Sequence, residues 1–370
     1  MTLAQICLAG FVLLCLALHL GGIGLAWSAL TRSTTPRPDR PGITILRPVC
    51  GLEHQLDQTL TTTFHIAYPT YEILFCAARA SDPAVPLVQR LIAAHPHVSA
   101  RLLIGDDPVS GNPKLNNLVK GWRAAAHPFV LMADSNVLLP PNTLTRLLDL
   151  WTPGTGLVSS PPIGVQPEGA WARLECAFLN TFQARWQLAS DRIGNGFAQG
   201  KMLFWQRSLL DDAGGLAALG HDMAEDVAAT KLVRATGLTV RLPARLFAQP
   251  IGPRSLHAVW SRQLRWSRVR RLGFPLYFLP ELLAGAAFPL AATLALAPSA
   301  ALPFLVLWYG AEYLLARFGD WPRSPADIAT WALRDALMPA LWVASWASSS
   351  FEWRGTVMTA DEVPHAPRGT

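Results

Sequence analysis

Residues 4–30 contain no Asp, Glu, Lys or Arg, and this apolar run limits the possible folds of the chain more than any other feature. At about 1.5 Å of rise per residue, a helix of this length crosses a hydrocarbon core roughly 30 Å thick. No Lys or Arg precedes the run and no clear small-residue cleavage site accompanies it, which disfavours a cleaved signal peptide. The sequence therefore predicts a transmembrane anchor over residues 1–31.

The segment after the anchor indicates where the rest of the chain lies. Arg32, Arg37 and Arg40 follow the apolar run within a few residues, so the positive-inside rule places the next domain in the cytoplasm. The five cysteines are scattered and show no metal-ligand spacing, as expected in a reducing compartment. A short chain rich in Ala, Arg and Pro further favours the inner membrane of a bacterium.

From residue 43 onward, short apolar runs alternate with helix-like stretches. The runs span residues 43–49, 72–78, 100–105 and 129–135, and the helix-like stretches span 53–66, 84–94 and 114–126. Alternation at this spacing is typical of a mostly parallel sheet with helices on both faces. Such sheets bind their ligands beyond the carboxyl ends of the strands. We therefore expect an α/β domain over residues 32–272, entered through the Pro-rich linker 33–42.

The remainder of the chain is first basic and then apolar. No Asp or Glu occurs between Asp226 and Glu281, whereas arginines occupy positions 241, 245, 254, 262, 265, 268, 270 and 271. The apolar segments 275–297, 300–316 and 329–351 predict membrane-associated or transmembrane helices over 273–351, followed by a tail over 352–370 whose last ten residues have a composition typical of disorder. A net charge of +6 without a Lys/Arg tail or an RNP-like motif favours anionic lipid and a diphosphate substrate over nucleic acid.

Asp134 lies near the end of the apolar run 129–135, where the site of such a sheet is expected. One carboxylate at a strand end, together with the phosphates of a bound nucleotide, is an adequate site for Mg²⁺ or Mn²⁺. The second carboxylate of a DxD motif is absent, and Asn136 stands in its place. The alternative is an Asx turn that ends the strand without binding a ligand.

Glu225 and Asp226 open a predicted helix within the stretch HDMAEDVAATKLV, residues 221–233. Carboxylates in the first turn of a helix often serve only to complement its dipole. In a sugar-transfer site, an Asp at this position could instead take the proton of the acceptor hydroxyl.

The stretch GNPKLNNL, residues 111–118, places Lys114 at the start of another predicted helix. The free N–H groups of that helix could help to hold an anion. Asn-Pro-Lys is equally ordinary at a junction between a loop and a helix, so the stretch alone does not define a site.

The motif RQLRW lies in the basic segment. Its Arg262, Arg265 and Trp266 share one face of a predicted helix, for which Ser255 is a suitable N-cap. Guanidinium groups suit phosphate oxygens, and the indole ring supplies a stacking surface. The alternative is a positive flank of the next membrane segment, which is the interpretation we favour for the arginines of residues 268–271.

In this order and spacing, GNPKLNNLVKG, ADSN, MAEDVAATKL and RQLRW resemble the motifs of the ceramide glucosyltransferase family of membrane-bound, inverting glycosyltransferases. The similarity covers most of residues 43–272. Arg262, Arg265 and Trp266 match the (Q/R)xxRW signature, Asp226 matches the Asp of the AED motif, and Asp134 matches the strand-end Asp of the metal site. The resemblance implies a GT-A type nucleotide-diphospho-sugar transferase domain, with a UDP-sugar as donor and a membrane sphingolipid as acceptor.

The resemblance also implies roles for single residues. Asp226 would be the catalytic base, and Asp134 would help to hold a divalent cation, Mg²⁺ or Mn²⁺, and the UDP diphosphate. The side chains of RQLRW would bind the diphosphate or close over donor and acceptor. Lys114 would lie near the nucleotide, and Lys201 is a further candidate for contacting the sugar phosphate.

The sequence departs from the family pattern at the first Asp, which is expected after the second strand. Arg79 occupies that place, and Asp82 follows three residues later. Asp82 is therefore the candidate donor contact in this region, and the roles of both residues stay open.

We expect a ceramide glucosyltransferase that transfers glucose from UDP-glucose to the primary hydroxyl of ceramide in one inverting displacement. This reaction needs a base for the hydroxyl and positive charge for the departing UDP, but no covalent nucleophile. Alternatives are another UDP-sugar (galactose, glucuronate, N-acetylglucosamine) or another acceptor (diacylglycerol, a hopanoid-pathway lipid). A processive polysaccharide synthase uses similar motifs, but the C-terminal membrane part is small for a polymer channel. A non-catalytic, membrane-anchored binder of anionic lipid is an alternative of another class.

Overall fold

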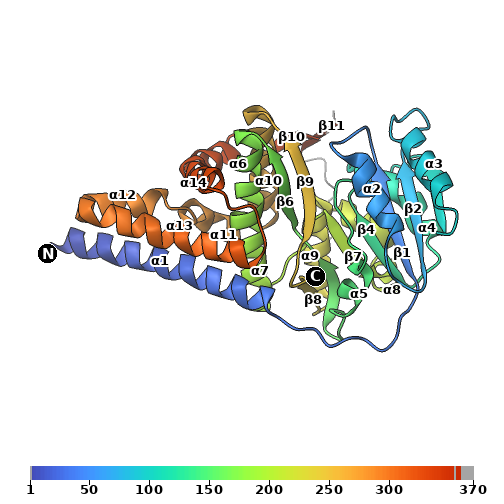
Figure 1. Cartoon of the computed structure of the whole chain (residues 1–370), viewed down its shortest axis with the longest axis horizontal. Helices are drawn as coiled ribbons and strands as arrows, with labels where there is room; N and C mark the ends of the chain where they lie inside the picture. Colours follow the sequence, from blue (N-terminus) through green and yellow to red (C-terminus); the bar gives the residue numbers. More distant parts are fainter. Residues whose placement is uncertain (1, 354–355, 360–370) are drawn as a thin grey trace, which may run out of the picture. The chain divides into compact units, whose positions relative to one another are not determined.

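The computed structural model describes residues 2–353 and 356–359 and divides the chain into two compact units, whose elements are labelled in Figure 1. The helical unit comprises the chain up to residue 31 together with residues 163–193 and 251–351. The sheet unit comprises residues 32–162 and 194–250 and the described residues beyond 351. Residues 163–193 and 251–272, which lie inside the predicted 32–272 domain, are thus grouped with the helical unit, so the domain boundaries themselves stay a prediction.

The sheet unit is built on one seven-stranded sheet with the order β3-β2-β1-β4-β7-β5-β8. Its strands are β1 (Ile43–Val49), β2 (Tyr71–Ala77), β3 (Ala100–Ile104), β4 (Phe129–Ala133), β5 (Thr155–Ser159), β7 (Met202–Gln206) and β8 (Thr239–Arg241). β1 pairs in parallel with β2 and β4, β2 with β3, and β5 with β8, whereas β7 runs antiparallel to β4 and β5. The predicted α/β fold with a mostly parallel sheet is confirmed.

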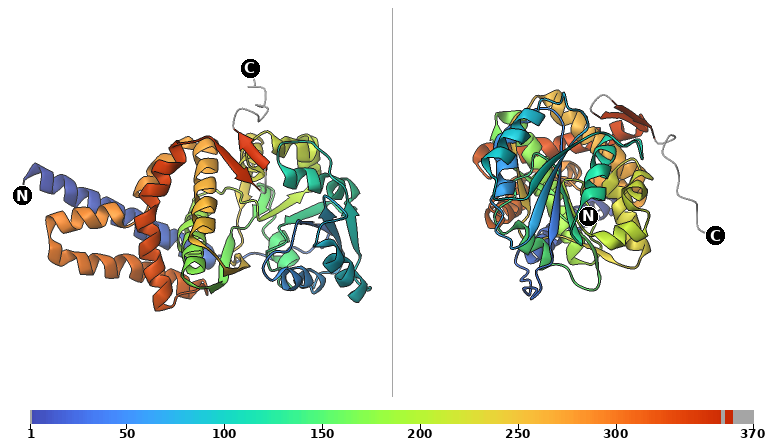
Figure 2. Two further views of the ribbon diagram at one scale, coloured as in Figure 1. Left: turned by 90° about the horizontal axis from the view of Figure 1, so that it is seen from above. Right: turned by 90° about the vertical axis from the view of Figure 1, so that its right-hand side faces the viewer.

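Helices cover both faces of this sheet, as the right-hand view of Figure 2 shows. They are α2 (Leu56–Phe64), α3 (Val85–Ala94), α4 (Pro113–Ala124), α5 (Thr143–Leu148), α8 (Arg207–Asp212), η2 (Gly215–Gly220) and α9 (Glu225–Ala235). Asn112 begins α4, because its side chain accepts a hydrogen bond from the Lys114 N–H and Pro113 fits the first turn. A Cβ on Gly121 would lie 2.6 Å from Cys76 Sγ, so α4 can approach β2 closely only with glycine there.

The helical unit is built mainly from helices. They are α1 (Leu3–Leu30), α6 (Ala170–Ala177), the π-helix η1 (Phe178–Ala184), α7 (Arg185–Arg192), α10 (Leu256–Gly273), α11 (Pro275–Phe278), η3 (Leu279–Leu283), α12 (Ala287–Leu296), η4 (Pro298–Ala300), α13 (Ala301–Phe318) and α14 (Pro325–Trp346). Ser255 caps α10 as predicted, since its Oγ accepts from the Ala258 N–H at 3.1 Å. α1 packs against α7, α12 and α13.

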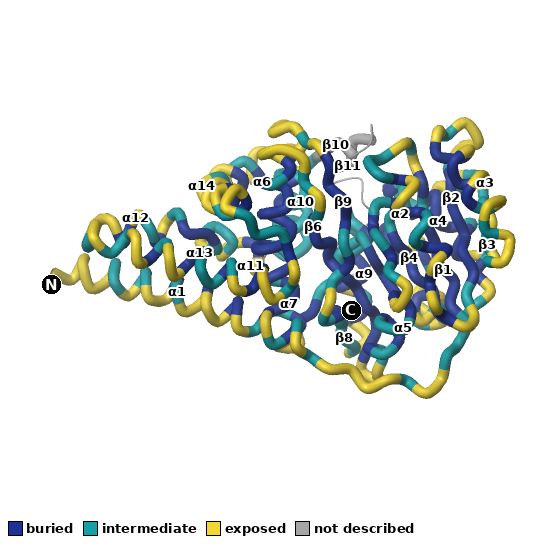
Figure 3. Tube along the Cα trace, in the orientation of Figure 1, coloured by how far each residue is buried: buried dark blue, intermediate teal, exposed yellow. Residues whose placement is uncertain are grey.

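Three helical segments within the described residues are long and apolar enough to cross a membrane: Leu3–Leu30, Pro275–Leu296 and Pro298–Phe318. Figure 3 shows exposed residues spaced along α1, α12 and α13 between less exposed ones, and their exposed side chains include Leu13 and Val306. Apolar surface of this extent is stable against lipid tails rather than against water. The chain is therefore a membrane protein, with the predicted N-terminal span.

The third predicted C-terminal membrane segment, residues 329–351, is not among these three. α14 covers most of that segment but carries Asp327, Arg334 and Asp335, all of which are buried. Its contacts are with α6 and α10 of the same unit. These charges explain why α14 lacks the apolar length of the other three segments.

A buried ion network joins α1, α7, α13 and α14 within the helical unit. Arg185 lies 2.9 Å from His19 Nδ1 and 3.3 Å from Glu312 Oε1. Arg334 pairs with Glu312 at 2.9 Å and with Asp335 at 2.8 Å. None of these side chains is more than 2% exposed. Because a charge in apolar surroundings is costly unless it is paired, the network ties the four helices together.

Two small sheets complete the fold. β6 (Pro162–Glu168) pairs with β9 (Phe247–Pro253), and β10 (Ser350–Trp353) pairs with β11 (Thr356–Thr359). The second sheet falls largely in the region predicted as a tail over 352–370, so part of that region forms strands. Residues 361–370, for which the composition predicted disorder, are outside the residues that the structure describes.

Candidate active site

Asp134 directly follows β4, at the carboxyl end of a strand that runs parallel to β1. Two lysines flank its carboxylate: Oδ1 lies 2.7 Å from Lys114 Nζ, and Oδ2 lies 2.9 Å from Lys201 Nζ. Burial opposes ionisation, but the two ammonium groups outweigh it and hold the pKa of Asp134 well below its usual value. The structure thus brings together three of the predicted site residues around a carboxylate that is charged at neutral pH.

Lys114 also connects Asp134 to the start of α9. Its Nζ lies 2.8 Å from Glu225 Oε1, while the Asn112 side chain donates to the other Glu225 oxygen at 2.9 Å. Burial alone would lower the pKa of Lys114, but Asp134 and Glu225 raise it above its usual value. Lys114 is therefore a fixed positive charge at the site.

Asp226 opens α9 beside this ion-paired group and is only partly exposed. Its Oδ2 accepts a hydrogen bond from the Gly200 N–H at 2.9 Å. Burial, followed by the charge of Glu225, raises the pKa of Asp226 to about 7. A carboxyl group with such a pKa is suited to accept a proton at neutral pH.

Gly200 holds the two parts of this arrangement together. Its carbonyl accepts from Lys114 Nζ and its N–H donates to Asp226. A Cβ at this position would lie 2.7 Å from Glu225 Oε1, so a larger residue would displace that carboxylate, and it would be in van der Waals contact with Asp226 Oδ2 at 3.5 Å. We name these residues of the sheet unit the carboxylate–lysine cluster: Asn112, Lys114, Asp134, Gly200, Lys201, Glu225 and Asp226.

Three members of the cluster were not predicted as site residues. Glu225 was interpreted only as a partner of the helix dipole, and Asn112 and Gly200 were not singled out. The sequence carried a signal for Asn112 and Gly200, because each lies next to, or within two residues of, a predicted lysine. What it lacked was the contact between α4 and α9, which pairs Lys114 with Glu225.

The RQLRW motif lies on α10, in the helical unit. Arg262 Nη1 is 3.0 Å from Oε1 of Glu175, a buried residue of α6. Trp266 packs against a buried apolar cluster of the same unit, and Arg265 precedes it on the helix. Arg262 and Trp266 therefore hold α10 within the helical unit, and a role of the motif at the donor stays a prediction.

The arginines that follow the motif have partners inside the helical unit. Arg268 and Arg271 donate to the backbone carbonyls of Ser350 and Ser348, at 2.8 and 3.0 Å. Arg270 pairs with Glu281 of η3 at 2.7 Å. These contacts fasten the end of α10 to other parts of the unit, in addition to any effect of their charge on lipid.

Asp82 supports a loop of the sheet unit. Its two carboxylate oxygens accept from the Gly51 N–H at 3.0 and 3.1 Å, and Oδ1 also accepts from the Ala84 N–H at 2.9 Å. A donor contact of Asp82 therefore stays a prediction.

Asp134 is the residue that would hold the divalent cation implied by the resemblance. Among the described residues, no group of three or more His, Cys, Asp or Glu side chains could hold a metal ion by itself. The Asp134 carboxylate is ionised and its side chain is 22% exposed, but both of its oxygens are paired with lysines, so a cation bound there would have to replace Lys114 or Lys201. A single carboxylate can share Mg²⁺ or Mn²⁺ with the phosphate oxygens of a substrate.

Comparison with protein families matches residues 2–366 to the family described as Glycosyl transferase family 21. The chain belongs to this family. Two curated relatives come from Caenorhabditis elegans. Ceramide glucosyltransferase 1 is 29% identical over 246 residues, which cover 65% of this chain and 52% of the relative. Ceramide glucosyltransferase 3 is 26% identical over 372 residues, which cover 95% and 80%.

These matches confirm the resemblance to ceramide glucosyltransferases that the motifs predicted. This family-21 chain spans about half the length of the first of the two relatives. A mannosyltransferase from Pyrobaculum calidifontis, solved in complex with GDP-Man and Mn²⁺, superposes with a TM-score of 0.57 at 20% identity. The superposition covers 92% of this chain and 98% of that protein, and it supports the predicted GT-A fold.

Proposed function

We propose that this family-21 protein transfers glucose from UDP-glucose to the primary hydroxyl of ceramide at the membrane surface, with inversion at the anomeric carbon. The observation that carries the proposal is the carboxylate–lysine cluster, which combines a carboxyl group of pKa about 7 with a carboxylate flanked by two lysines. The ceramide glucosyltransferases among its relatives support the sugar and the acceptor.

The cluster supplies the groups that a single displacement needs. Asp226 takes the proton of the acceptor hydroxyl as its oxygen bonds to the anomeric carbon, and the bond to UDP breaks on the opposite face. Lys114 and Lys201 offset the negative charge that develops on the departing diphosphate. A divalent cation, held by Asp134, would add to this charge neutralisation. Arg262, Arg265 and Trp266 are proposed to contact the diphosphate or to close over donor and acceptor.

The membrane helices suit a lipid acceptor that stays in the bilayer. We place the sheet unit in the cytoplasm, because Arg32, Arg37 and Arg40 follow the first span. The inner membrane of a bacterium is the proposed location.

The proposal is tested with the purified full chain in vesicles that contain ceramide or diacylglycerol. UDP-glucose, UDP-galactose, UDP-glucuronate and UDP-N-acetylglucosamine are each supplied, with and without EDTA, and glycolipid is detected by mass spectrometry. We expect glucosylceramide as the main product and a loss of activity in EDTA that Mn²⁺ or Mg²⁺ restores. No glycolipid from any pair would refute the enzyme, and preference for another pair would reassign its sugar or acceptor.

The pH profile tests the role of Asp226. The base must be deprotonated to accept a proton, so kcat/KM is expected to rise about tenfold per pH unit below about pH 7 and to level off above it. The measurement is the initial rate of glucosylceramide formation from pH 5 to pH 9 at constant ionic strength. A limb centred near pH 4, the ordinary value for Asp, would contradict the raised pKa.

Gly200→Ala tests the packing of the cluster. The added Cβ is expected to displace Glu225, which pairs with Lys114 and whose charge acts on Asp226, and to lower kcat/KM by roughly 10²-fold, because a shift of about 1 Å can cost that much. Gly154→Ala is the matched control, since a Cβ there meets no atom within 4 Å. Equal activity of the two variants would show that the close approach of Gly200 has no bearing on transfer.

A further inference from the structure

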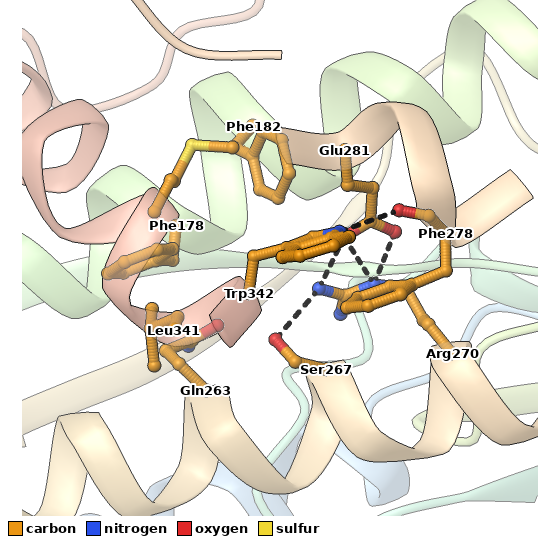
Figure 4. A pocket seen from close by; sticks show the side chains of 10 residues that line it. Phe178, Phe182, Gln263, Ser267, Arg270, Phe278, Glu281, Leu341 and Trp342 are labelled. Atoms are coloured by element: carbon orange, nitrogen blue, oxygen red, sulfur yellow. Dashed lines mark hydrogen bonds and ion pairs between the residues drawn. The ribbon is translucent and has the colours of Figure 1, made fainter. Parts of the chain in front are cut away.

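Figure 4 shows a small hollow in the helical unit, lined by residues of η1, α10, η3 and α14 among others. Its volume of about 20 Å³ leaves room for one or two waters, since one water needs roughly 10–15 Å³. Arg270 and Glu281 in its wall pair with each other, as the dashed lines show. The hollow is therefore too small for a substrate group. A contact with more chemical content lies in the sheet unit, at Lys201.

Lys201 bridges two side-chain oxygens that follow one strand end. Its Nζ lies 2.9 Å from Asp134 Oδ2 and 3.1 Å from Asn136 Oδ1. Lys201 directly precedes β7, which pairs antiparallel with β4, and the Asp134 N–H donates to the Lys201 carbonyl at 3.0 Å. Backbone pairing thus fixes the lysine opposite Asp134 and Asn136, and its ammonium group faces both oxygens.

The two oxygens that Lys201 contacts are also ligands for a divalent cation. Carboxylate and carbonyl oxygens are the protein ligands that suit Mg²⁺ and Mn²⁺. Asn136 stands where the second carboxylate of a DxD motif would be, and its amide oxygen can coordinate a cation without adding negative charge. An ammonium group and a divalent cation therefore compete for the same place beside Asp134.

The other lysine of the cluster, Lys114, is held more firmly. Its Nζ contacts Asp134 Oδ1 at 2.7 Å, Glu225 Oε1 at 2.8 Å and the Gly200 carbonyl at 2.5 Å, which engages all three of its donors. Lys201 Nζ has one carboxylate and one amide as partners among the described residues. Moving Lys114 would leave buried Glu225 without its cation, which is costly. Moving Lys201 leaves Asp134 paired with Lys114, so Lys201 is the ammonium group that a cation replaces more easily.

We propose that Lys201 and the divalent cation exchange places: Lys201 holds the position between Asp134 and Asn136 while no donor is bound, and yields it to Mg²⁺ or Mn²⁺ when the donor diphosphate binds. Asp134 and Asn136 are then protein ligands of the cation, and Lys201 pairs with a phosphate oxygen. The inference rests on the proposed function, which supplies a nucleoside diphosphate. It adds Asn136 to the site and makes the binding of cation and diphosphate mutually dependent.

Charge is the physical reason for this dependence. A cation that binds alone must break both contacts of Lys201 and leave the ammonium group without acceptors. A diphosphate supplies oxygens for the displaced ammonium group and further ligands for the cation. Because coupling between two ligands is reciprocal, UDP and Mn²⁺ must raise each other's affinity by the same factor, which we expect to be about tenfold or more.

Binding of Mn²⁺ to the purified full chain in mild detergent is the first test. The electron paramagnetic resonance signal of free Mn²⁺ gives the Kd, with and without UDP. Without UDP, Lys201→Met is expected to bind Mn²⁺ about tenfold more tightly than wild type, because no charge-assisted hydrogen bond has to be broken. UDP should then raise the affinity of Lys201→Met by a smaller factor than that of wild type. Lys231→Met, which removes a lysine paired with Asp222 outside the cluster, is the control and should match wild type.

A second variant separates coordination from a general effect of charge, since removing any nearby cation strengthens Mn²⁺ binding. Asn136→Ala changes no charge but removes the proposed amide ligand. In the Lys201→Met background it is expected to weaken Mn²⁺ binding by about threefold or more, the scale of one lost polar contact.

Lysine labelling of the wild-type chain tests the exchange without any variant. Reductive methylation with formaldehyde is followed by mass spectrometry, with Mn²⁺ alone, with Mn²⁺ and UDP, and with neither. The side chain of Lys201 is 14% exposed and held by two partners, so its labelling rate is expected to rise about threefold or more in saturating Mn²⁺. The rate should fall again when UDP is added. Lys114 is the internal control and should stay slow throughout.

The outcomes separate this inference from the proposed function. Equal Mn²⁺ affinity of wild type and Lys201→Met would overturn it, as would faster labelling of Lys114 in place of Lys201 or an Asn136→Ala change without effect. Glucosylceramide formation at full rate in EDTA would overturn the exchange and leave the transfer standing. Coupled binding of Mn²⁺ and UDP that depends on Lys201, in a chain that glycosylates no lipid, would support the exchange and refute the transfer.

Discussion

Replacing Asp226 with Asn is expected to lower the rate of glucosylceramide formation by about 10²- to 10⁴-fold, the usual contribution of a positioned general base. Asn has nearly the shape of Asp and can still accept from the Gly200 N–H, but its amide cannot take the proton of the acceptor hydroxyl. Binding of UDP-glucose is therefore expected to remain within a few-fold of wild type. The two measurements are the initial rate of product formation and the affinity for UDP-glucose from calorimetry.

Asp222→Asn is the matched control, because Asp222 pairs with Lys231 at 2.5 Å and belongs to the same stretch of sequence without joining the carboxylate–lysine cluster. It should keep near-normal activity. Normal transfer by Asp226→Asn would remove Asp226 as the base. Normal lipid binding by a chain that never transfers sugar would instead favour the non-catalytic binder of anionic lipid.

The parallel part of the sheet could be predicted because local pattern and topology agree there. β1 matches the predicted run 43–49, and the following three strands lie close to their predicted positions. Runs that are buried on both faces show nearly continuous hydrophobicity, and an intervening helix implies parallel pairing. β7 has an equally apolar sequence, but it enters the sheet between β4 and β5 and antiparallel to both. Nothing in its own residues specifies that direction.

At the candidate site too, the residues could be predicted from local sequence, whereas their contacts with one another could not. Asp134, Lys114 and Asp226 could be named because motif order and strand ends mark them. Their mutual contacts could not, because Lys114 meets Glu225 across 111 residues of sequence. The pKa of Asp226 depends on that packing as well, since burial and Glu225 are its main causes. Arg262 was predicted from its charge, its spacing and its match to the (Q/R)xxRW signature, and its pairing with buried Glu175 required the three-dimensional structure.

The second large effect is expected at the buried ion network, where Glu312 accepts from both Arg185 and Arg334. Replacing Glu312 with Leu leaves these two guanidinium groups inside the helical unit without their shared carboxylate, although Arg334 keeps Asp335. Removing one partner of a buried ion pair typically costs about 3–5 kcal/mol, and Glu312 is fully buried. We therefore expect the free energy of unfolding to fall by about that amount.

The measurement is denaturant unfolding of the full chain in lipid nanodiscs or mild detergent micelles, followed by tryptophan fluorescence. The chain has 14 tryptophans, and one of them, Trp308, stacks on His19 of α1 at 3.7 Å between ring centroids, so the summed emission includes a contribution from separation of α1 and α13. Arg317→Gln, at an exposed position on α13, is the control and should change the unfolding free energy by less than about 0.5 kcal/mol. Equal stability of Glu312→Leu and Arg317→Gln would show that water or lipid headgroups reach the network. In that case hydrophobic packing, and not these charges, would hold α1 against α13.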